Sequence, residues 1–178
     1  TVTVSSAGAN ATLVVAISGT SFSFTAPAAN AEINISDGTT PTSVTVRYTT
    51  DGNTPAVGKT VTFATTRGIF TGGGNVANVL TDNNGEASIG ISSTSAGIAT
   101  IQASVAADLV STERSIEFVA ITPATVTLQA SPATLGVNES STLTAVVRDA
   151  TANPVKNKTV SFSLTQDATG GSISPVTA

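Results

Sequence analysis

Hydrophobic and polar residues alternate with a period of two along most of the chain, and this period predicts β-strands. In the segment 42–48, Val44, Val46 and Tyr48 fall on one face while Ser, Thr and Arg residues fall on the other. We therefore expect each such strand to have one buried face. The same alternation predicts strands at 60–63, where Val61 and Phe63 would face inward, and at 88–91, 99–105 and 115–118.

Clusters of turn-forming residues separate these strands. They lie at 51–53, 72–75 and 82–85 and are rich in Gly, Asn and Asp, which favour tight turns. No segment has the period of a helix. Short strands with turns between them at a spacing of about 8 to 12 residues are typical of an antiparallel β-sandwich of the immunoglobulin type.

An internal repeat shows that the chain holds more than one such unit. The segment Pro55-Ala-Val-Gly-Lys-Thr-Val-Thr-Phe63 returns as Pro154-Val-Lys-Asn-Lys-Thr-Val-Ser-Phe162, 99 residues later. This period is close to the length of one immunoglobulin-like sandwich. The sequence therefore predicts an all-β chain of tandem sandwiches.

The repeat also predicts where the modules begin and end. The strands around 1–17 resemble those at 88–105, and Phe24-Thr-Ala26 resembles Phe118-Val-Ala120. We therefore expect residues 1–28 to be the closing strands of a partial module and residues 30–120 to be a complete module. Residues 121–178 would be the opening strands of a second partial module, because strands at 126–128, 141–147 and 159–162 repeat the start of the complete one.

Composition excludes several classes of function. The chain has no Cys and no His, so it lacks disulfides, zinc–thiolate sites and the commonest general base. Its net charge is −4 and only 10% of its residues are charged, which argues against binding of nucleic acid. No apolar run is long enough to span a bilayer. Since Thr1 is not an initiating Met, we expect a mature or excised part of a longer precursor.

Three motifs, in order along the chain, give a family resemblance. They are Thr81-Asp-Asn-Asn-Gly-Glu-Ala87, Ser95-Ala-Gly-Ile-Ala-Thr-Ile101, and Val147-Arg-Asp149 followed by Asn153-Pro-Val155 and Thr159-Val-Ser-Phe162. Together they resemble the bacterial Ig-like domains of group 1, the invasin and intimin type. The resemblance implies extracellular spacer modules of bacterial surface proteins, with no enzymatic activity and no shared binding site. The segment 51–55 departs from the family spacing, so we expect that loop to differ in conformation.

The turn at 82–86 has two interpretations. We favour a tight turn in which Asn84 and Gly85 allow positive φ and the Asp82 side chain accepts backbone N–H groups. The alternative is a calcium site, since Asp82, Asn83, Asn84 and Glu86 all carry oxygen atoms. The loop follows the spacing of no calcium motif that we can name. We therefore assign no catalytic, cofactor-binding or metal-binding residue and expect no cofactor.

Other residues suggest less probable chemistry. Lys59 and Lys158 open equivalent strands, and each could form a Lys–Asn isopeptide bond beside a buried carboxylate; a solvated lysine is the simpler interpretation. The glycines at 72–74 lack the Gly-Lys-Ser/Thr ending of a phosphate loop and predict a hairpin. Four Asn-x-Ser/Thr sequons matter only if the source glycosylates asparagine, and they begin at Asn10, Asn34, Asn138 and Asn157.

The two partial modules suggest how chains could join. Leu143, Val147, Val160 and Phe162 would face inward in the second partial module, whose apolar sheet needs a cover. The strands of 1–28 would supply this cover from a neighbouring chain, a head-to-tail contact that makes an open filament. The alternative is that the chain is a segment of a longer tandem array.

We therefore expect an extracellular, non-enzymatic structural protein of the bacterial cell surface, acting as a stalk or filament repeat. Its partners would be copies of itself or adjacent Ig-like modules, with neither nucleic acid nor membrane insertion. The alternatives are a spacer of a large adhesin, a surface-layer or sheath component, and a module that binds a receptor or glycan through the loop 68–76. Few aromatic anchors are present for such binding, with one Tyr and no Trp.

Overall fold

The computed structural model describes residues 2–7, 9–13, 19–35, 40–167 and 170–177. Parts of the three predicted segments lie outside these residues. They are positions 1, 8 and 14–18 of the segment 1–28, positions 36–39 of the segment 30–120, and positions 168–169 and 178 of the segment 121–178. The last residue of the Asn34 sequon, Ser36, is among them. Among the residues that are described, no helix is long and apolar enough to cross a membrane.

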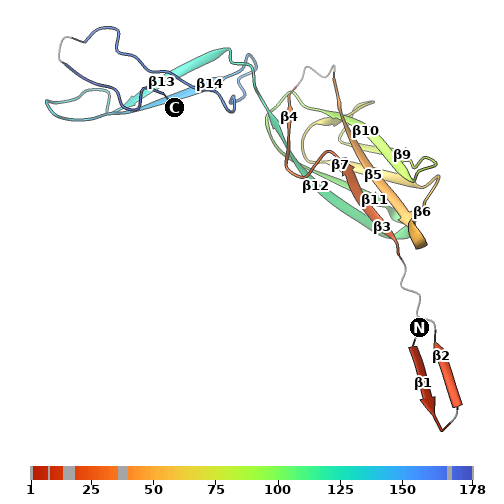
Figure 1. Ribbon diagram of the computed structural model, residues 1–178. Helices are drawn as coiled ribbons and strands as arrows, with labels where there is room; N and C mark the ends of the chain where they lie inside the picture. The colour runs from red at the N-terminus through yellow and green to blue at the C-terminus, as the bar shows by residue number, and fades with distance from the viewer. Residues whose placement is uncertain (1, 8, 14–18, 36–39, 168–169, 178) are drawn as a thin grey trace.

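Two packed β-sheets form the centre of the molecule (Figure 1). The first sheet has the strand order β3-β5-β10-β8, with the short β6 paired to β5; the second has the order β4-β12-β11-β7-β9. All strand pairs are antiparallel except β4 with β12, which is parallel. The strands of the sandwich are β3 (Ser21–Ala26), β4 (Ala31–Asn34), β5 (Thr42–Thr50), β6 (Thr54–Pro55), β7 (Thr60–Thr65), β8 (Ile69–Phe70), β9 (Val76–Leu80), β10 (Glu86–Ser92), β11 (Gly97–Val105) and β12 (Val110–Val119).

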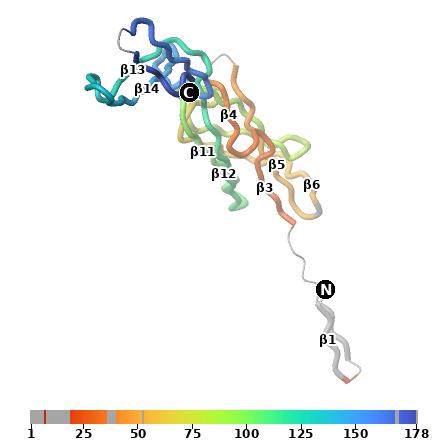
Figure 2. The backbone as a smooth tube through the Cα atoms, turned by 60° about the vertical axis from the view of Figure 1, so that its left-hand side comes forward, coloured from red at the N-terminus to blue at the C-terminus, as the bar shows by residue number. Residues whose placement is uncertain are grey.

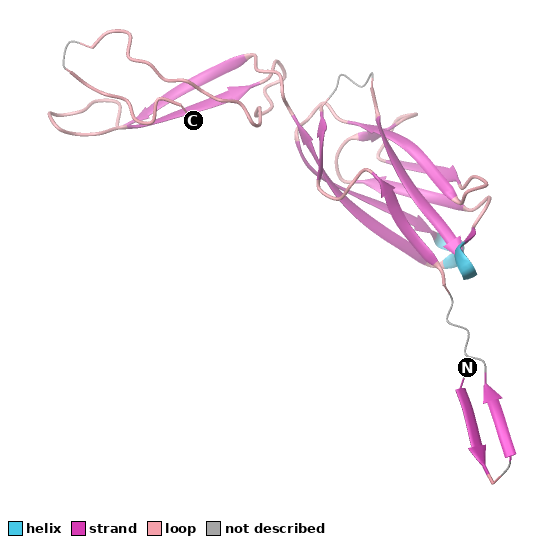
Figure 3. Cartoon of the chain, viewed as in Figure 1, coloured by secondary structure: helices cyan, strands magenta, loops and turns pink. Residues whose placement is uncertain are grey.

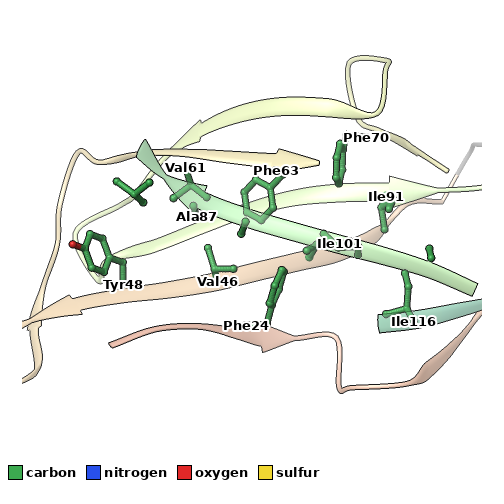
Figure 4. Close-up of a cluster of buried hydrophobic side chains, with 14 of the residues drawn as sticks. Phe24, Val46, Tyr48, Val61, Phe63, Phe70, Ala87, Ile91, Ile101 and Ile116 are labelled. Atoms are coloured by element: carbon green, nitrogen blue, oxygen red, sulfur yellow. The ribbon is translucent and has the colours of Figure 1, made fainter. Parts of the chain in front are cut away.

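The core lies between the two sheets and follows the alternation of the sequence (Figure 4). Val44, Val46 and Tyr48 of β5 are at most 3% exposed, and Val61 and Phe63 of β7 are fully buried. The predicted inward faces of these two strands are therefore confirmed. Full burial of a Val or Phe side chain contributes about 1.5–3 kcal/mol, so these positions define much of the stability.

The first strand of the sandwich, β3, does not lie in the module to which the sequence assigned it. Residues 21–26 were predicted to close a preceding module, but β3 pairs with β5 inside the sandwich, with Phe22 opposite Tyr48 and Phe24 opposite Val46. Phe24 is 6% exposed and belongs to the core. The reason is that β3 has Phe on two alternating positions, and the apolar face of the sandwich covers them.

Residues before β3 form a separate hairpin. Strand β1 (Val2–Ser6) pairs antiparallel with β2 (Ala9–Leu13), with Val2 opposite Leu13. The strands that this segment resembles in sequence, β10 and β11, lie in different sheets of the sandwich and do not pair. The resemblance in sequence therefore does not carry over to the strand pairing.

The second repeat reproduces the first pairing of the sandwich. Strand β13 (Thr125–Ser131) pairs with β14 (Thr142–Arg148), with Val126 opposite Val147 and Leu128 opposite Ala145. With the chain repeat of 99 residues, Val147 and Ala145 correspond to Tyr48 and Val46 of β5. The register of β13 on β14 is thus that of β3 on β5.

Beyond β14 the second repeat has little regular structure (Figure 3). The strand predicted at 159–162 is not formed as such; Ser161 makes an isolated bridge with Thr177. Its counterpart β7 lies between β11 and β9, and the described part of the second repeat contains no equivalent of either. A strand without neighbours has no partners for its backbone groups. Leu143, Val147, Val160 and Phe162, predicted to face inward, are half-buried here.

Candidate functional site: the joint between two repeats

Within the described ranges, no group of three or more Asp and Glu residues could hold a metal ion. The features that the family motifs do build are two turns with the same bonding pattern, around Asp82 and Asp149, although in the repeat Asp149 corresponds to Thr50. The second of these turns lies where the sandwich meets the next repeat.

The turn at 82–86 is organised by its first residue. The Oδ1 atom of Asp82 accepts hydrogen bonds from the N–H groups of Asn84 at 2.8 Å and Glu86 at 2.9 Å. These bonds hold the pKa of the Asp82 carboxyl below its ordinary value of 3.8. Gly85 adopts a φ of +74°, which L-residues rarely adopt. The tight turn predicted from the sequence is confirmed.

The turn at 149–153 has the same bonding pattern. The Oδ1 atom of Asp149 accepts hydrogen bonds from the N–H groups of Thr151 at 2.9 Å and Asn153 at 2.8 Å. Burial acts to raise the pKa of Asp149, but the bonds from Asn153 and Thr151 together hold it below its ordinary value. Ala152 takes the place of Gly85, with a φ of +67°. The turn therefore fixes the direction in which Asn153 leaves it.

The Asn153 side chain crosses to the sandwich. Its Oδ1 atom accepts a hydrogen bond from the N–H of Ala96 at 3.0 Å, and its Nδ2 atom donates to the carbonyl of Thr94 at 3.1 Å. Nδ2 also donates to Oδ2 of Asp149 at 3.0 Å. A single amide thus binds one donor and one acceptor on the loop between β10 and β11. The family motif at 153–155 can be recognised in the sequence, but nothing in it indicates that its Asn makes contacts across the joint.

A second contact lies beside it. Lys156 Nζ is 2.6 Å from the carboxylate of Glu32 on β4 and 2.7 Å from that of Glu117 on β12. These two carboxylates, Glu117 foremost, raise the pKa of Lys156. The Lys156 N–H also donates to the carbonyl of Ala120 at 3.1 Å, and Val155 forms a parallel bridge with Ala120. The second repeat is therefore tied to strands β4 and β12 of the second sheet and to the loop between β10 and β11, at one end of the sandwich (Figure 2).

A shallow groove runs along this joint. Its lining comes from the sandwich, the connecting segment and the second repeat: Ile35, Thr94, Ala120, Ile121, Thr122, Ala124 and residues 149–151. Its polar contacts are those of the Asp149 turn. We interpret it as the seam between the two repeats.

The two candidate cross-linking lysines lie in different surroundings. Lys59 Nζ forms an ion pair with Asp108 Oδ2 at 2.9 Å, and the Tyr48 hydroxyl donates to the same oxygen at 2.9 Å. Lys158 is exposed. Lys59 thus forms an ion pair with Asp108 at the end of the sandwich that lies far from the joint.

The remaining candidate segments are surface features. The glycines 72–74 all have positive φ and turn the chain between β8 and β9, as predicted. The loop at 51–53, which departs from the family spacing, forms a short 3-10 helix. The corresponding segment of the second repeat forms the Asp149 turn, so the predicted difference in conformation is confirmed. Of the sequons, Asn34 lies in β4, and Asn138 and Asn157 are exposed.

Comparison with known proteins gives a family and two similar structures. The model of the bacterial Ig-like domain (group 1) matches residues 21–119. A C-terminal 282-residue fragment of intimin, solved with the intimin-binding domain of the translocated intimin receptor, is 24% identical with a TM-score of 0.46, over 62% of this chain and 35% of that one. Invasin, titled a bacterial integrin-binding protein, is 24% identical with a TM-score of 0.41, over 77% of this chain and 27% of that one.

The chain therefore spans about a third or less of the length of these two proteins. The comparison with curated proteins finds no match. The match of the family begins at the first residue of β3 and ends at the last residue of β12, which are the bounds of the sandwich. Since it covers more than half of the 178 residues and agrees with the motifs of the sequence, the chain belongs to the family of bacterial Ig-like domains, group 1.

Proposed function

We propose that the chain is a non-enzymatic spacer segment of a bacterial cell-surface adhesin, in which Ig-like modules follow one another to form a stalk. The observation that carries the proposal is the joint: side chains and backbone of the second repeat bind the end of the sandwich at Asn153 and Lys156. Such contacts restrict the angle between modules. Fixed angles let a row of modules hold a binding tip away from the cell.

The course of the chain supports a lengthwise arrangement. The chain enters the sandwich at one end through β3 and leaves at the other end through β12 (Figure 1). Each added module therefore extends the molecule. Intimin and invasin, the similar proteins named above, are surface adhesins with partners of their own, and the proposal places this chain in the same class.

The surface of the described residues offers little for tight binding of a receptor. Tyr48, the one tyrosine, is 3% exposed, and Phe63, Phe70 and Phe118 are buried. Aromatic residues are the commonest energetic centres of protein interfaces. This distribution favours a spacer over a module that binds a receptor or glycan.

The proposal is tested by small-angle scattering on the whole chain together with a glycan and receptor array. We expect scattering of an extended particle with ordered modules, and no saturable binding. Saturable binding that is lost on substitution within 68–76 would instead favour the binding module.

A filament subunit is the second candidate. Val126 and Leu128 on β13 are 60% and 59% exposed, whereas Phe24 at the place of Leu128 is 6% exposed in the sandwich. Strands of a neighbouring chain could cover this face and close the second repeat. Electron microscopy and size-exclusion chromatography decide between the two: fibres support the subunit, and a monomer at high concentration rules it out.

A further inference from the structure

The two repeats differ at the residues that make the joint. With the repeat of 99 residues, Asn153 corresponds to Thr54 and Lys156 to Val57, while Pro154 corresponds to Pro55. The proline is shared, but Thr54 follows a short 3-10 helix whereas Asn153 follows the Asp149 turn, and β7 has no counterpart strand at 159–162. The two side chains that contact the sandwich are among those replaced, together with Val155 in place of Ala56 and Asn157 in place of Gly58.

We propose that Asn153 and Lys156 are a recognition pair by which the end of the sandwich selects the module that follows it. A module with Asn and Lys three residues apart after an Asp turn is accepted there. A module with Thr and Val at these places, such as the sandwich itself, is not. The inference deepens the proposed spacer function and rests on it, because it names the partner that each joint accepts.

The amide of Asn153 fits its site through both of its polar groups. The loop presents one N–H, of Ala96, and one carbonyl, of Thr94, and the amide has one acceptor and one donor to match them. A threonine hydroxyl is shorter and cannot bind both. Without the amide, the partly buried Ala96 N–H and the exposed Thr94 carbonyl would lose their partner across the joint, and the contact would be weaker.

Lys156 is selected by charge. Its ammonium lies between Glu32 and Glu117, which both contact Nζ and so stand close to each other. A valine at this place would cover the two adjacent carboxylates with an apolar side chain and leave them without a cation. Repulsion of the wrong partner contributes to specificity as much as attraction of the right one.

The backbone contacts of the joint cannot supply this selection. The bond from the Lys156 N–H to the Ala120 carbonyl and the bridge of Val155 to Ala120 use groups that every non-proline residue has. They set the alignment of the two chains. The choice of module is left to the side chains at 153 and 156.

The test uses the full chain with one spin label on each repeat. Because the chain has no cysteine, Q102C on β11 and T127C on β13 give the only two labels, both at exposed positions far from the joint contacts. Pulsed electron resonance then reports the distribution of distances between the repeats. We expect a narrow distribution in the chain with the native joint and an at least twofold broader one in N153T/K156V, which carries the residues of the first repeat.

Matched variants separate recognition from general damage. T54N/V57K makes the reverse exchange outside the joint and should leave the distribution narrow. N153D keeps the size of the side chain but removes its donor, and should broaden the distribution. E32K/E117K/K156E reverses all three charges and should restore a narrow distribution that K156E alone loses. Unfolding of the sandwich by urea should be unchanged by every substitution at 153 and 156.

The outcomes distinguish the two proposals. A broad distribution with the native joint would contradict the spacer with ordered modules. A narrow native distribution that stays narrow in N153T/K156V and in K156E would overturn the recognition pair while the spacer proposal stands. If N153T/K156V and K156E both broaden the distribution of distances, and E32K/E117K/K156E restores a narrow one, the recognition pair is supported.

Discussion

At the scale of the residue, two glycines have nearly equal φ angles but different surroundings. Their substitution by alanine therefore separates the cost of backbone strain from the cost of steric overlap. Gly58 and Gly85 have φ of +70° and +74°. A Cβ on Gly58 would meet nothing within 4 Å, whereas one on Gly85 would collide with the Tyr48 carbonyl oxygen. We expect G58A to lower the free energy of unfolding by about 1 kcal/mol, the cost of a left-handed conformation. G85A adds overpacking against backbone, for a total of about 3 kcal/mol.

Urea unfolding of both variants, followed by circular dichroism, measures this difference. Because the Gly58 substitution controls for φ, an equal loss in both variants would show that the contact of Gly85 with β5 is not tight.

Tyr48 gives a second residue-scale prediction. Burial, and then the hydrogen bond to Asp108 and its negative charge, raise the pKa of the Tyr48 hydroxyl above its ordinary 10.0. The folded state thus favours the neutral phenol, so its contribution to stability is complete below pH 10.0 and is lost as the pH rises through the folded-state pKa. As the only tyrosine, Tyr48 alone gives the phenolate absorbance of the chain.

We expect this absorbance to rise at higher pH in the folded chain than in urea. D108N should lower the folded-state pKa only part of the way, since burial is the larger cause. Equal titration of the folded and unfolded chain would contradict the prediction.

Residue-scale chemistry was the most predictable part of the molecule. The Asp82 turn and the inward faces of β5 and β7 follow from bonding and alternation within a few residues. Asn153 could be recognised as part of a motif, but its contacts could not, because Thr94 and Ala96 present only backbone groups, which every sequence has. No pattern of side chains marks such an acceptor.

At the scale of the element, β3 depends on one side chain of the opposite sheet. Arg114 on β12 donates to the carbonyls of Pro27 at 2.6 Å and Phe24 at 2.9 Å, and its guanidinium lies 5.3 Å from the centre of the Phe24 ring. We expect R114M to destabilise the sandwich by about 2–4 kcal/mol, since two charge-assisted bonds are lost. Amide exchange in β3 should quicken more than in β11.

R114K is the control, because it keeps the charge but lacks the planar fork that reaches two carbonyls. It should give a smaller loss of the same kind. Unchanged exchange of the β3 amides in R114M would show that pairing with β5 alone holds the strand.

The boundary at β3 shows where pattern reading fails. Phe24-Thr-Ala26 resembles Phe118-Val-Ala120, and that resemblance placed 21–26 in the wrong module. The better comparison aligns Phe22 and Phe24 with Val126 and Leu128, which occupy the same register in the second repeat. Alternation predicts that a strand exists, but the partner strand is decided by apolar surface brought from elsewhere in the chain.

At the scale of the whole molecule, the joint combines two kinds of contact that respond differently to salt. The Lys156 and Glu117 side chains are 40% and 36% exposed, so their ion pair is open to screening. The screening length falls from about 10 Å at 0.1 M salt to about 3 Å at 1 M. The two bonds of Asn153 across the joint, with Ala96 and Thr94, join neutral groups and should persist.

We therefore expect 1 M salt to broaden the distribution of distances between the repeats to that of K156V, and no further. In K156V itself salt should have little effect, because the screened pair is already absent. N153A should be broad at both salt concentrations, and salt should broaden it again, since its Lys156 contact remains. If 1 M salt left the native distribution unchanged, the ion pairs of Lys156 would contribute nothing to the order of the joint, and Asn153 with the backbone bridge at Ala120 would hold the repeats together.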